Sequence, residues 1–180
     1  TSTAQSDLNI ALRSGHGEFP RVVIAPGNSK ECIEKTNEAI HLAEKFNTLS
    51  IVLSDKHIAE SQFSFDTKID PILKVPLNRK IPGKSIVRSN GYEHDANGNT
   101  IESAKLVEIG AKRRISNYKK IQKYCNKFQM VKIYGPKKSK NLVVGWGSTK
   151  SVILDSIKGL DVKFLQVLYL KPMSKEIKKY

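Results

Sequence analysis

Three short runs of the sequence carry side chains that could do chemistry, and the first is His16-Gly17-Glu18-Phe19-Pro20-Arg21. It offers an imidazole, a carboxylate and a guanidinium directly before an apolar run. Such groups could act as acid and base, or hold the carboxylate of a ligand through charge-assisted hydrogen bonds. A polar loop without a ligand is the alternative, and composition alone favours it. We therefore assign no catalytic base to this run.

The other two runs lie later in the chain. Residues 92–98 form a predicted loop that contains His94 and Asp95, either as solvated turn residues or as ligand contacts. Gly145-Trp146-Gly147-Ser148-Thr149 follows a predicted strand and opens a predicted helix, so its backbone N–H groups could hold a phosphate. This run lacks the third glycine of a dinucleotide fingerprint and the Gly-Lys-Ser/Thr of a P-loop. A tight turn without a ligand explains it equally well.

Metal binding is not indicated by the sequence. The four histidines lie in four different predicted elements: His16, His41, His57 and His94. No His-x-x-x-His or Cys-x-x-Cys pair occurs, which are spacings that zinc sites use. The two cysteines, Cys32 and Cys125, are far apart, so we expect reduced thiols and a cytoplasmic setting.

The net charge of +14 is concentrated in one segment. Residues 100–140 hold 12 Lys and Arg against 2 Asp and Glu, whereas residues 1–60 have a net charge of −2. Local charge of this kind indicates a phosphorylated ligand, an acidic protein, nucleic acid or a lysine-rich surface. Nucleic acid is a weak candidate, because Tyr118 and Tyr124 are the only tyrosines of the predicted basic helix that could stack on bases, and no known nucleic-acid motif occurs. No apolar run approaches the ~20 residues of a membrane-spanning helix, which excludes a membrane protein.

Residues 1–60 are predicted to form an α/β unit that positions the first run. Residues 21–25 and 49–53 are apolar apart from Arg21 and Ser50, which is typical of strands covered on both faces. Between them a helix begins at the N-cap Asn28, with Glu31 in the capping-box position. Strand, helix and strand in this order predict a parallel crossover. Apolar residues recur every three or four positions along the helix, and most charged residues, including Glu31, Lys35 and Glu38, fall off that face.

The remaining chain is predicted to form a linker, a basic helix and a second α/β unit. Residues 61–99 are interrupted by Pro71, Pro76 and Pro82, which indicates an extended connection between domains. Residues 100–129 predict a basic connecting helix that Thr100 caps. Residues 130–180 predict strands at 130–134, 141–144 and 162–167 with a helix at 149–158. This unit is too small to bury a core unaided.

Taken in order, these motifs closely resemble the alpha subunit of 2-oxoacid:ferredoxin oxidoreductases. The matching segments are 6–8, 16–27, 42–46, 52–56, 92–98, 112–113, 144–150 and 163–167. The resemblance implies an α/β fold of parallel-sheet, transketolase-like units. Residues 1–60 would be the later half of a thiamine-diphosphate pyrimidine-binding domain. Residues 130–180 would be the incomplete start of a domain that resembles the C-terminal domain of transketolase.

The resemblance also implies a reaction. Such enzymes oxidatively decarboxylate a 2-oxoacid, transfer the acyl group to coenzyme A and reduce ferredoxin. Their thiamine diphosphate and Mg²⁺ are shared with a beta subunit, which also holds an iron–sulfur cluster. His16, Glu18 and Arg21 would face the cofactor-containing interface, and His94 and Asp95 could reach over the substrate. The basic surface could meet the phosphates of coenzyme A or an acidic ferredoxin.

Two departures from that pattern define a further expectation. The family's Tyr-Pro-Ile-Thr-Pro-like motif and its cofactor-activating glutamate do not occur in the sequence. We therefore expect this chain to be a piece of a longer subunit, and we expect the piece to be inactive by itself. Its motifs do not indicate which 2-oxoacid is the substrate. The alternative hypothesis is a basic module that binds nucleic acid or an acidic protein.

Overall fold

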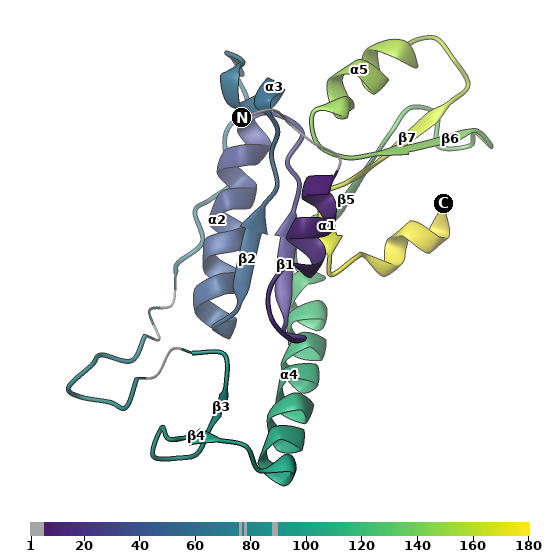
Figure 1. The fold of residues 1–180 in the computed structure, drawn as a ribbon. Coiled ribbons are helices and arrows are strands. Elements are labelled where there is room, and N and C mark those ends of the chain that lie inside the picture. Colours follow the sequence, from purple (N-terminus) through teal and green to yellow (C-terminus); the bar gives the residue numbers. More distant parts are fainter. Residues whose placement is uncertain (1–5, 76, 78, 88–89) are drawn as a thin grey trace.

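Helices alternate with single strands or with pairs of strands along the chain (Figure 1). The computed structural model describes residues 6–75, 77, 79–87 and 90–180, so residues 1–5, Pro76, residue 78 and residues 88–89 lie outside the described part. The elements in chain order are α1 (Ser6–Arg13), β1 (Arg21–Ile24), α2 (Ser29–Phe46), β2 (Leu49–Val52), α3 (Lys56–Glu60), β3 (Glu93–His94), β4 (Thr100–Ile101), α4 (Ala104–Cys125), β5 (Val131–Tyr134), β6 (Leu142–Gly145), α5 (Thr149–Ser156), β7 (Lys163–Val167), β8 (Tyr169–Lys171) and a 3₁₀ helix (Lys175–Lys179).

The first sheet has the strand order β2-β1-β8. β1 and β2 pair in parallel with α2 between them, as the sequence predicts, and all four residues of β1 are buried. β8 pairs antiparallel with the other edge of β1, which the sequence analysis did not predict. The reason is the short connection between β7 and β8, which is the single, fully buried residue Leu168. The chain therefore passes from the second sheet straight into the first.

The second sheet has the strand order β5-β7-β6. β6 and β7 are parallel around α5, whereas β5 and β7 are antiparallel. A parallel pair needs a crossover connection, which α2 supplies in the first sheet and α5 in the second. Each sheet is therefore mixed, and the prediction of parallel sheets is correct for one pair of strands in each.

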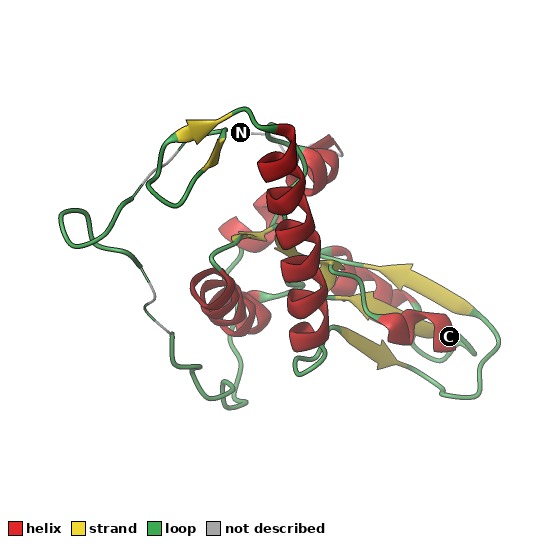
Figure 2. Cartoon of the chain, turned by 90° about the horizontal axis from the view of Figure 1, so that it is seen from below, coloured by secondary structure: helices red, strands yellow, loops and turns green. Residues whose placement is uncertain are grey.

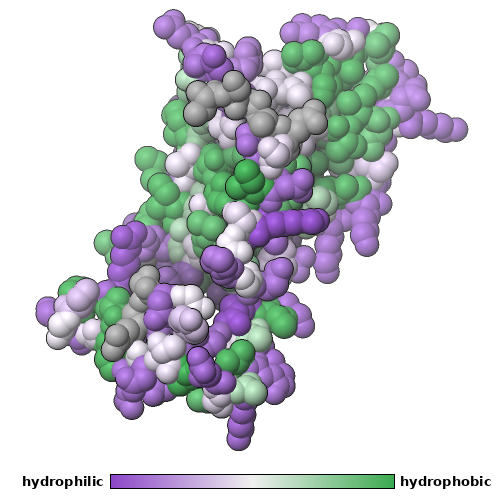
Figure 3. Space-filling view, in the orientation of Figure 1, coloured by the Kyte–Doolittle hydropathy of each residue, from purple (hydrophilic) through white to green (hydrophobic). Residues whose placement is uncertain are grey.

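Apolar side chains gather on the surface over α5 and β6, where Val144 and Val152 are exposed (Figure 3).

The buried face of α2 differs from the prediction. Glu31, Lys35 and Glu38 are buried, whereas Ile33 and Ile40 are about half exposed, at 46% and 48%. The N-cap is as predicted, because the side chain of Asn28 accepts the N–H of Glu31. The three charged residues are buried because other elements provide partners that the periodicity of α2 does not reveal.

The long helix α4 passes beside the first sheet and is shorter than predicted (Figure 2). Thr100 lies in β4, which forms a hairpin with β3, and Ser103 is the N-cap. Only the C-terminal half of α4 enters the core, through Ile121 and Cys125. The apolar side chains nearer its N-terminus, at Leu106, Val107, Ile109 and Ile115, are between 39% and 59% exposed.

One core cluster joins both halves of the chain. It consists of Val22, Ile24, Ala39, Leu42, Ile121, Cys125, Met130, Leu168 and Tyr169.

Between α3 and β3 the described residues form no helix or strand, only one isolated bridge between Pro82 and Ser85. The division of the chain into domains at residues 60, 99 and 129 stays a prediction. None of the described helices is long and apolar enough to cross a bilayer.

Candidate functional site

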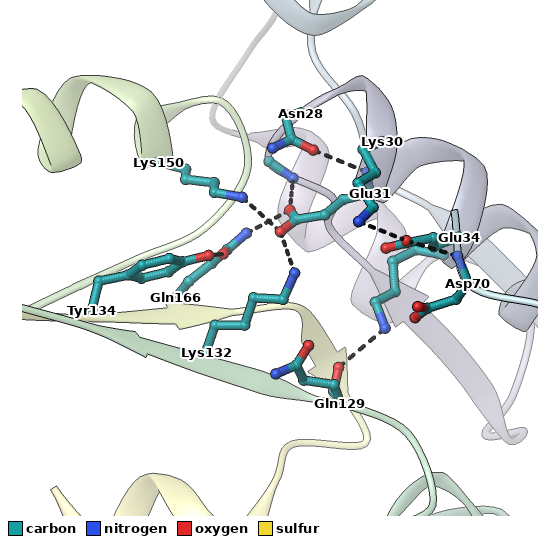
Figure 4. A network of polar contacts seen from close by, with 12 residues as sticks. Asn28, Lys30, Glu31, Glu34, Asp70, Gln129, Lys132, Tyr134, Lys150 and Gln166 are labelled. Atoms are coloured by element: carbon teal, nitrogen blue, oxygen red, sulfur yellow. Dashed lines mark hydrogen bonds and ion pairs between the residues drawn. The ribbon is translucent and has the colours of Figure 1, made fainter. Parts of the chain in front are cut away.

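Glu31 is the centre of the densest polar cluster (Figure 4). Its Oε1 accepts hydrogen bonds from Lys132 Nζ at 2.8 Å and Lys150 Nζ at 2.7 Å. Its Oε2 accepts hydrogen bonds from the Gly27 N–H at 2.8 Å and Gln166 Nε2 at 2.7 Å. The donors come from β5, α5, β7 and the turn after β1, so this carboxylate connects the two sheets.

The charge of Glu31 is fixed by these donors. Burial alone would raise its pKa, but the hydrogen bonds from Lys132, Lys150 and Gly27 outweigh burial and lower the pKa to about 2. A carboxylate with four donors and so low a pKa is a poor general base. Glu31 is therefore a structural residue, although the cluster resembles an active site in composition.

A second cluster joins α2 to β8. Lys35 Nζ donates to Glu38 Oε1 at 2.7 Å and to the carbonyl of Gln129 at 3.2 Å. The Tyr169 hydroxyl donates to Glu38 Oε2 at 2.5 Å, and burial raises the pKa of that hydroxyl. Sequence reasoning missed this face. The signal was present, because Glu31, Lys35 and Glu38 recur at spacings of four and three, which is one helix face.

The run from His16 to Arg21 is divided between two roles. His16 and Glu18 are exposed in a loop with two left-handed glycines, Gly15 and Gly17. Arg21 is buried and donates to the carbonyls of Ala11, at 3.3 Å, and Ser14, at 2.6 Å. Those carbonyls lie at the C-terminus of α1, where helix carbonyls lack intrahelical partners. The guanidinium of Arg21 therefore stabilises α1, and a position of Arg21 near the substrate or cofactor stays a prediction.

The predicted loop at residues 92–98 is the β3–β4 hairpin. Asp95 Oδ1 accepts the backbone N–H groups of Asn97 and Asn99, at 2.9 Å and 2.8 Å. Hydrogen bonds from Asn99 hold the pKa of Asp95 below its usual value. Asp95 therefore builds the turn. His94 is half-buried, and its Nε2 is buried without a hydrogen-bond partner among the described residues.

The neighbouring residue Glu93 connects this hairpin to α4. Its carboxylate pairs with Arg114 and lies 3.7 Å from the guanidinium of Arg113. Gly110 permits the approach, because a Cβ at that position would lie 2.5 Å from the Glu93 carboxyl group. The sequence pattern does not indicate the ion pair between Glu93 and Arg114.

The start of α5 already holds an anion from the chain itself. The Ser148 N–H donates to Asp55 Oδ2 at 3.2 Å, and Asp55 Oδ1 also caps α3. Burial would raise the pKa of Asp55, but the hydrogen bonds from Ser148 and Ile58 lower it. Asp55 thus occupies the position that the sequence suggests for a phosphate. A role of Gly145, Gly147, Ser148 and Thr149 in phosphate binding stays a prediction.

Two adjacent cavities lie between α4 and the amino ends of β1 and β2. The larger has a volume of ≈ 590 Å³ and the smaller ≈ 210 Å³, and Phe19, Pro20 and Arg114 line both. Glu18 lines the smaller cavity, and Glu93 reaches the shared wall through Arg114. The structure therefore brings the first run and the hairpin to one region, whereas the turn that starts α5 lies at the carboxyl end of β6.

Metal and nucleic-acid binding receive no support from the described residues. They contain no group of three or more His, Cys, Asp or Glu side chains that could hold a metal ion. Tyr124 stacks on His41 and makes edge contacts with Phe46 and Phe128, so its ring is not free to stack on a base. Cys32 and Cys125 are both free thiols.

Comparison with curated proteins identifies relatives along nearly the whole chain, although no protein-family model matches. The chain is 30% identical over 207 residues to the alpha subunit of 2-oxoacid:ferredoxin oxidoreductase from Saccharolobus solfataricus, covering 98% of this chain and 33% of the relative. The subunit alpha of 2-oxoacid:ferredoxin oxidoreductase 2 from Aeropyrum pernix is 29% identical over 202 residues, covering 96% and 31%. The chain thus spans about a third of the length of these relatives.

A solved structure shares the fold. It is the 2-oxoglutarate:ferredoxin oxidoreductase from Magnetococcus marinus, with 2-oxoglutarate, coenzyme A and succinyl-CoA bound. The TM-score is 0.70 at 23% identity, over 97% of this chain and 35% of that chain. The mixed α/β arrangement of two small sheets is therefore one that a known structure also has.

Proposed function

Because the chain resembles alpha subunits of 2-oxoacid:ferredoxin oxidoreductases over 98% of its length, we propose that it forms part of such a subunit. The enzyme would oxidatively decarboxylate a 2-oxoacid, form an acyl-CoA and reduce ferredoxin, in the cytoplasm. One observation carries this proposal: the similarity runs in order through both sheets and is not confined to one motif. A chance match of a phosphate-binding turn or a polar loop would cover only one of them.

The cofactors of the proposed enzyme are thiamine diphosphate with Mg²⁺, shared with the beta subunit, and an iron–sulfur cluster in that partner. Thiamine diphosphate supplies carbanion chemistry when bound. The described residues do not fit this cofactor. Open parallel sheets bind ligands at the carboxyl ends of their strands. Here the Glu31 cluster and the contact between Asp55 and Ser148 occupy the carboxyl ends. We therefore assign the cofactor to the partner and to other parts of the subunit.

The contribution of this chain is a framework with a few exposed polar groups. The Glu31 cluster joins the two sheets, and α4 holds the β3–β4 hairpin through Glu93. His16 and Glu18 are exposed beside the cavities, so they are our candidates for contact with the beta subunit at the cofactor-containing interface. Arg21 and Asp95 have local structural roles, and we do not propose them as ligand contacts.

The test is reconstitution of the complete alpha subunit with its beta subunit. Reduction of a viologen dye is followed with 2-oxoglutarate and with pyruvate, each with and without coenzyme A. We expect dye reduction that depends on both the 2-oxoacid and coenzyme A. Absence of reduction with every 2-oxoacid would contradict the proposal, provided that the two subunits co-purify.

A second candidate function is binding of an acidic protein by the basic helix α4. One observation favours it: the side chains of Lys112 and Arg113 are 73% and 77% exposed. Nucleic acid is a weaker partner because the ring of Tyr124 is enclosed. A salt titration distinguishes the two, since phosphate-backbone binding weakens with a log–log slope of roughly −0.9 per contacted phosphate.

A further inference from the structure

The pair Asn-Gly occurs twice in the sequence, as Asn90-Gly91 and as Asn97-Gly98, and the structure holds the two pairs differently. In such a pair the backbone nitrogen of the glycine can attack the side-chain carbonyl carbon of the asparagine, because the two atoms belong to one short ring and are never far apart. Glycine favours the attack, since it has no Cβ beside the nitrogen and its backbone is free to turn. The fold therefore decides which of the two pairs reacts.

The first pair is open to this attack. Asn90 and Gly91 are both exposed, and they directly precede the β3–β4 hairpin (Figure 1). The backbone N–H of Tyr92 donates to Asn90 Oδ1 at 3.0 Å, which folds the asparagine side chain back along the peptide unit of Gly91. The same N–H stabilises the negative charge that develops on Oδ1 during attack. The Gly91 N–H makes no hydrogen bond to the backbone of another described residue.

The second pair is protected within the hairpin. Gly98 is buried, and its N–H donates to the carbonyl of Asp95 at 3.1 Å, so the nitrogen that would attack is already engaged. The Asp95 carboxylate accepts the backbone N–H of Asn97 at 2.9 Å. This carboxylate places a negative charge beside the pair, and a nearby anion disfavours loss of a proton from the Gly98 nitrogen. The same dipeptide is therefore much less reactive here.

We propose that Asn90 is a site of spontaneous chemical modification, with water as the co-reactant. The Gly91 nitrogen loses its proton to the solvent and forms a bond to Asn90 Cγ. The bond between Cγ and Nδ2 breaks, and Nδ2 leaves as ammonia after taking up a proton from the solvent. Water then opens the cyclic imide at either carbonyl, which gives aspartate or isoaspartate. The reaction does not depend on the proposed oxidoreductase activity.

The modification changes the charge and the backbone at the entrance to the hairpin. Either product adds a carboxylate, so the net charge of +14 falls by one. Aspartate keeps an oxygen that can accept the N–H of Tyr92. In isoaspartate the main chain runs through Cβ, which inserts a methylene group and displaces that oxygen. Isoaspartate should therefore loosen the start of β3, which begins at Glu93 and is held on α4 by the ion pair of Glu93 with Arg114.

The test is incubation of the folded, intact protein in mildly alkaline water enriched in the heavy isotope of oxygen, followed by peptide mapping with mass spectrometry. Conversion during the incubation introduces one heavy oxygen, which distinguishes it from conversion before the experiment. We expect Asn90 to convert at least about tenfold faster than Asn97, a modest difference in activation free energy. In urea that unfolds the chain, the two rates should agree within about twofold, since only the fold distinguishes the pairs.

Gly91→Ala tests the attacking nitrogen. A Cβ at this position meets nothing within 4 Å, so the fold should be kept while the nitrogen becomes crowded. Conversion of Asn90 should slow by about tenfold, and Asn97 is the control within the same molecule because its rate should stay unchanged. Equal rates at Asn90 and Asn97 in the folded protein would overturn the proposal. Conversion of Asn90 only in urea, or at the same rate in Gly91→Ala as in the parent protein, would also overturn it.

Discussion

Replacing Glu31 by glutamine tests whether the buried carboxylate holds the two sheets together. An amide is nearly the same size, but it removes the negative charge that faces Lys132 and Lys150, whose side chains are only 23% and 9% exposed. The free energy of unfolding should fall by about 3.5 kcal/mol. Lowering a pKa from 4.5 to about 2 gives this figure, at about 1.4 kcal/mol per unit. Loss of one partner of a buried ion pair typically costs about 3–5 kcal/mol, which agrees.

The assay is urea denaturation of the parent protein and of Glu31→Gln at neutral pH. With a denaturant slope of about 2 kcal/mol per molar urea, the midpoint should fall by about 1.75 M. The matched control is Glu108→Gln, which removes an exposed carboxylate that pairs with Lys112 along α4. Its midpoint should change little, because exposed pairs contribute little to stability.

The pH dependence supplies an independent check. The pKa of Glu31 is lower in the folded protein than in the unfolded chain. Its contribution to stability is therefore fully present above about pH 4.5, and it is lost as the pH falls toward about 2. Glu31→Gln should lack this part of the acid destabilisation. If the variant unfolds at the same urea concentration as Glu108→Gln, the central role assigned to Glu31 is refuted.

Three further predictions follow from contacts described above. Tyr169→Phe removes the hydroxyl that donates to Glu38, so urea denaturation should show a loss of about 2 kcal/mol; an unchanged midpoint would contradict the contact. Gly27→Ala places a Cβ 2.8 Å from Gln166 Nε2 and 3.0 Å from the carbonyl of Gly147, so the protein should lose about 1–3 kcal/mol. Gly91→Ala, where a Cβ meets nothing within 4 Å, is its control and should be nearly neutral. Burial and the nearby Glu38 raise the pKa of Cys125 to about 12, so a thiol reagent should modify Cys32 first and Cys125 only as fast as the chain unfolds, as mass spectrometry after partial labelling would show.

The sequence pattern correctly predicted those helices and strands that depend on residues close to them in the chain. The apolar run of β1, the cap at Asn28 and the crossover between β1 and β2 all depend on neighbours within one or two turns or along one strand. The buried face of α2 was predicted wrongly because the partners of Glu31 lie 101, 119 and 135 positions away. No periodicity within the helix reveals partners at such separations.

The candidate site shows the same difference between what nearby residues determine and what distant residues determine. The sequence singled out the run from His16 to Arg21, and the structure places Glu18 beside a cavity. It did not indicate that Arg21 would be used by the C-terminus of α1, or that Asp55 would meet the start of α5. Side chains that can hold a ligand can equally hold the backbone, and only the fold decides between the two uses.

The passage from β7 into β8 around Leu168 has a consequence for biosynthesis. β1 ends at Ile24, but its second neighbour, β8, is complete only when Lys171 has been made. A nascent chain on the ribosome therefore carries β1 with the backbone N–H and C=O groups of one edge unpaired until β8 has been made. Unpaired edges recruit other strands, and pairings between distant residues form slowly. A chaperone that shields this edge during translation should raise the yield more than one that acts after release.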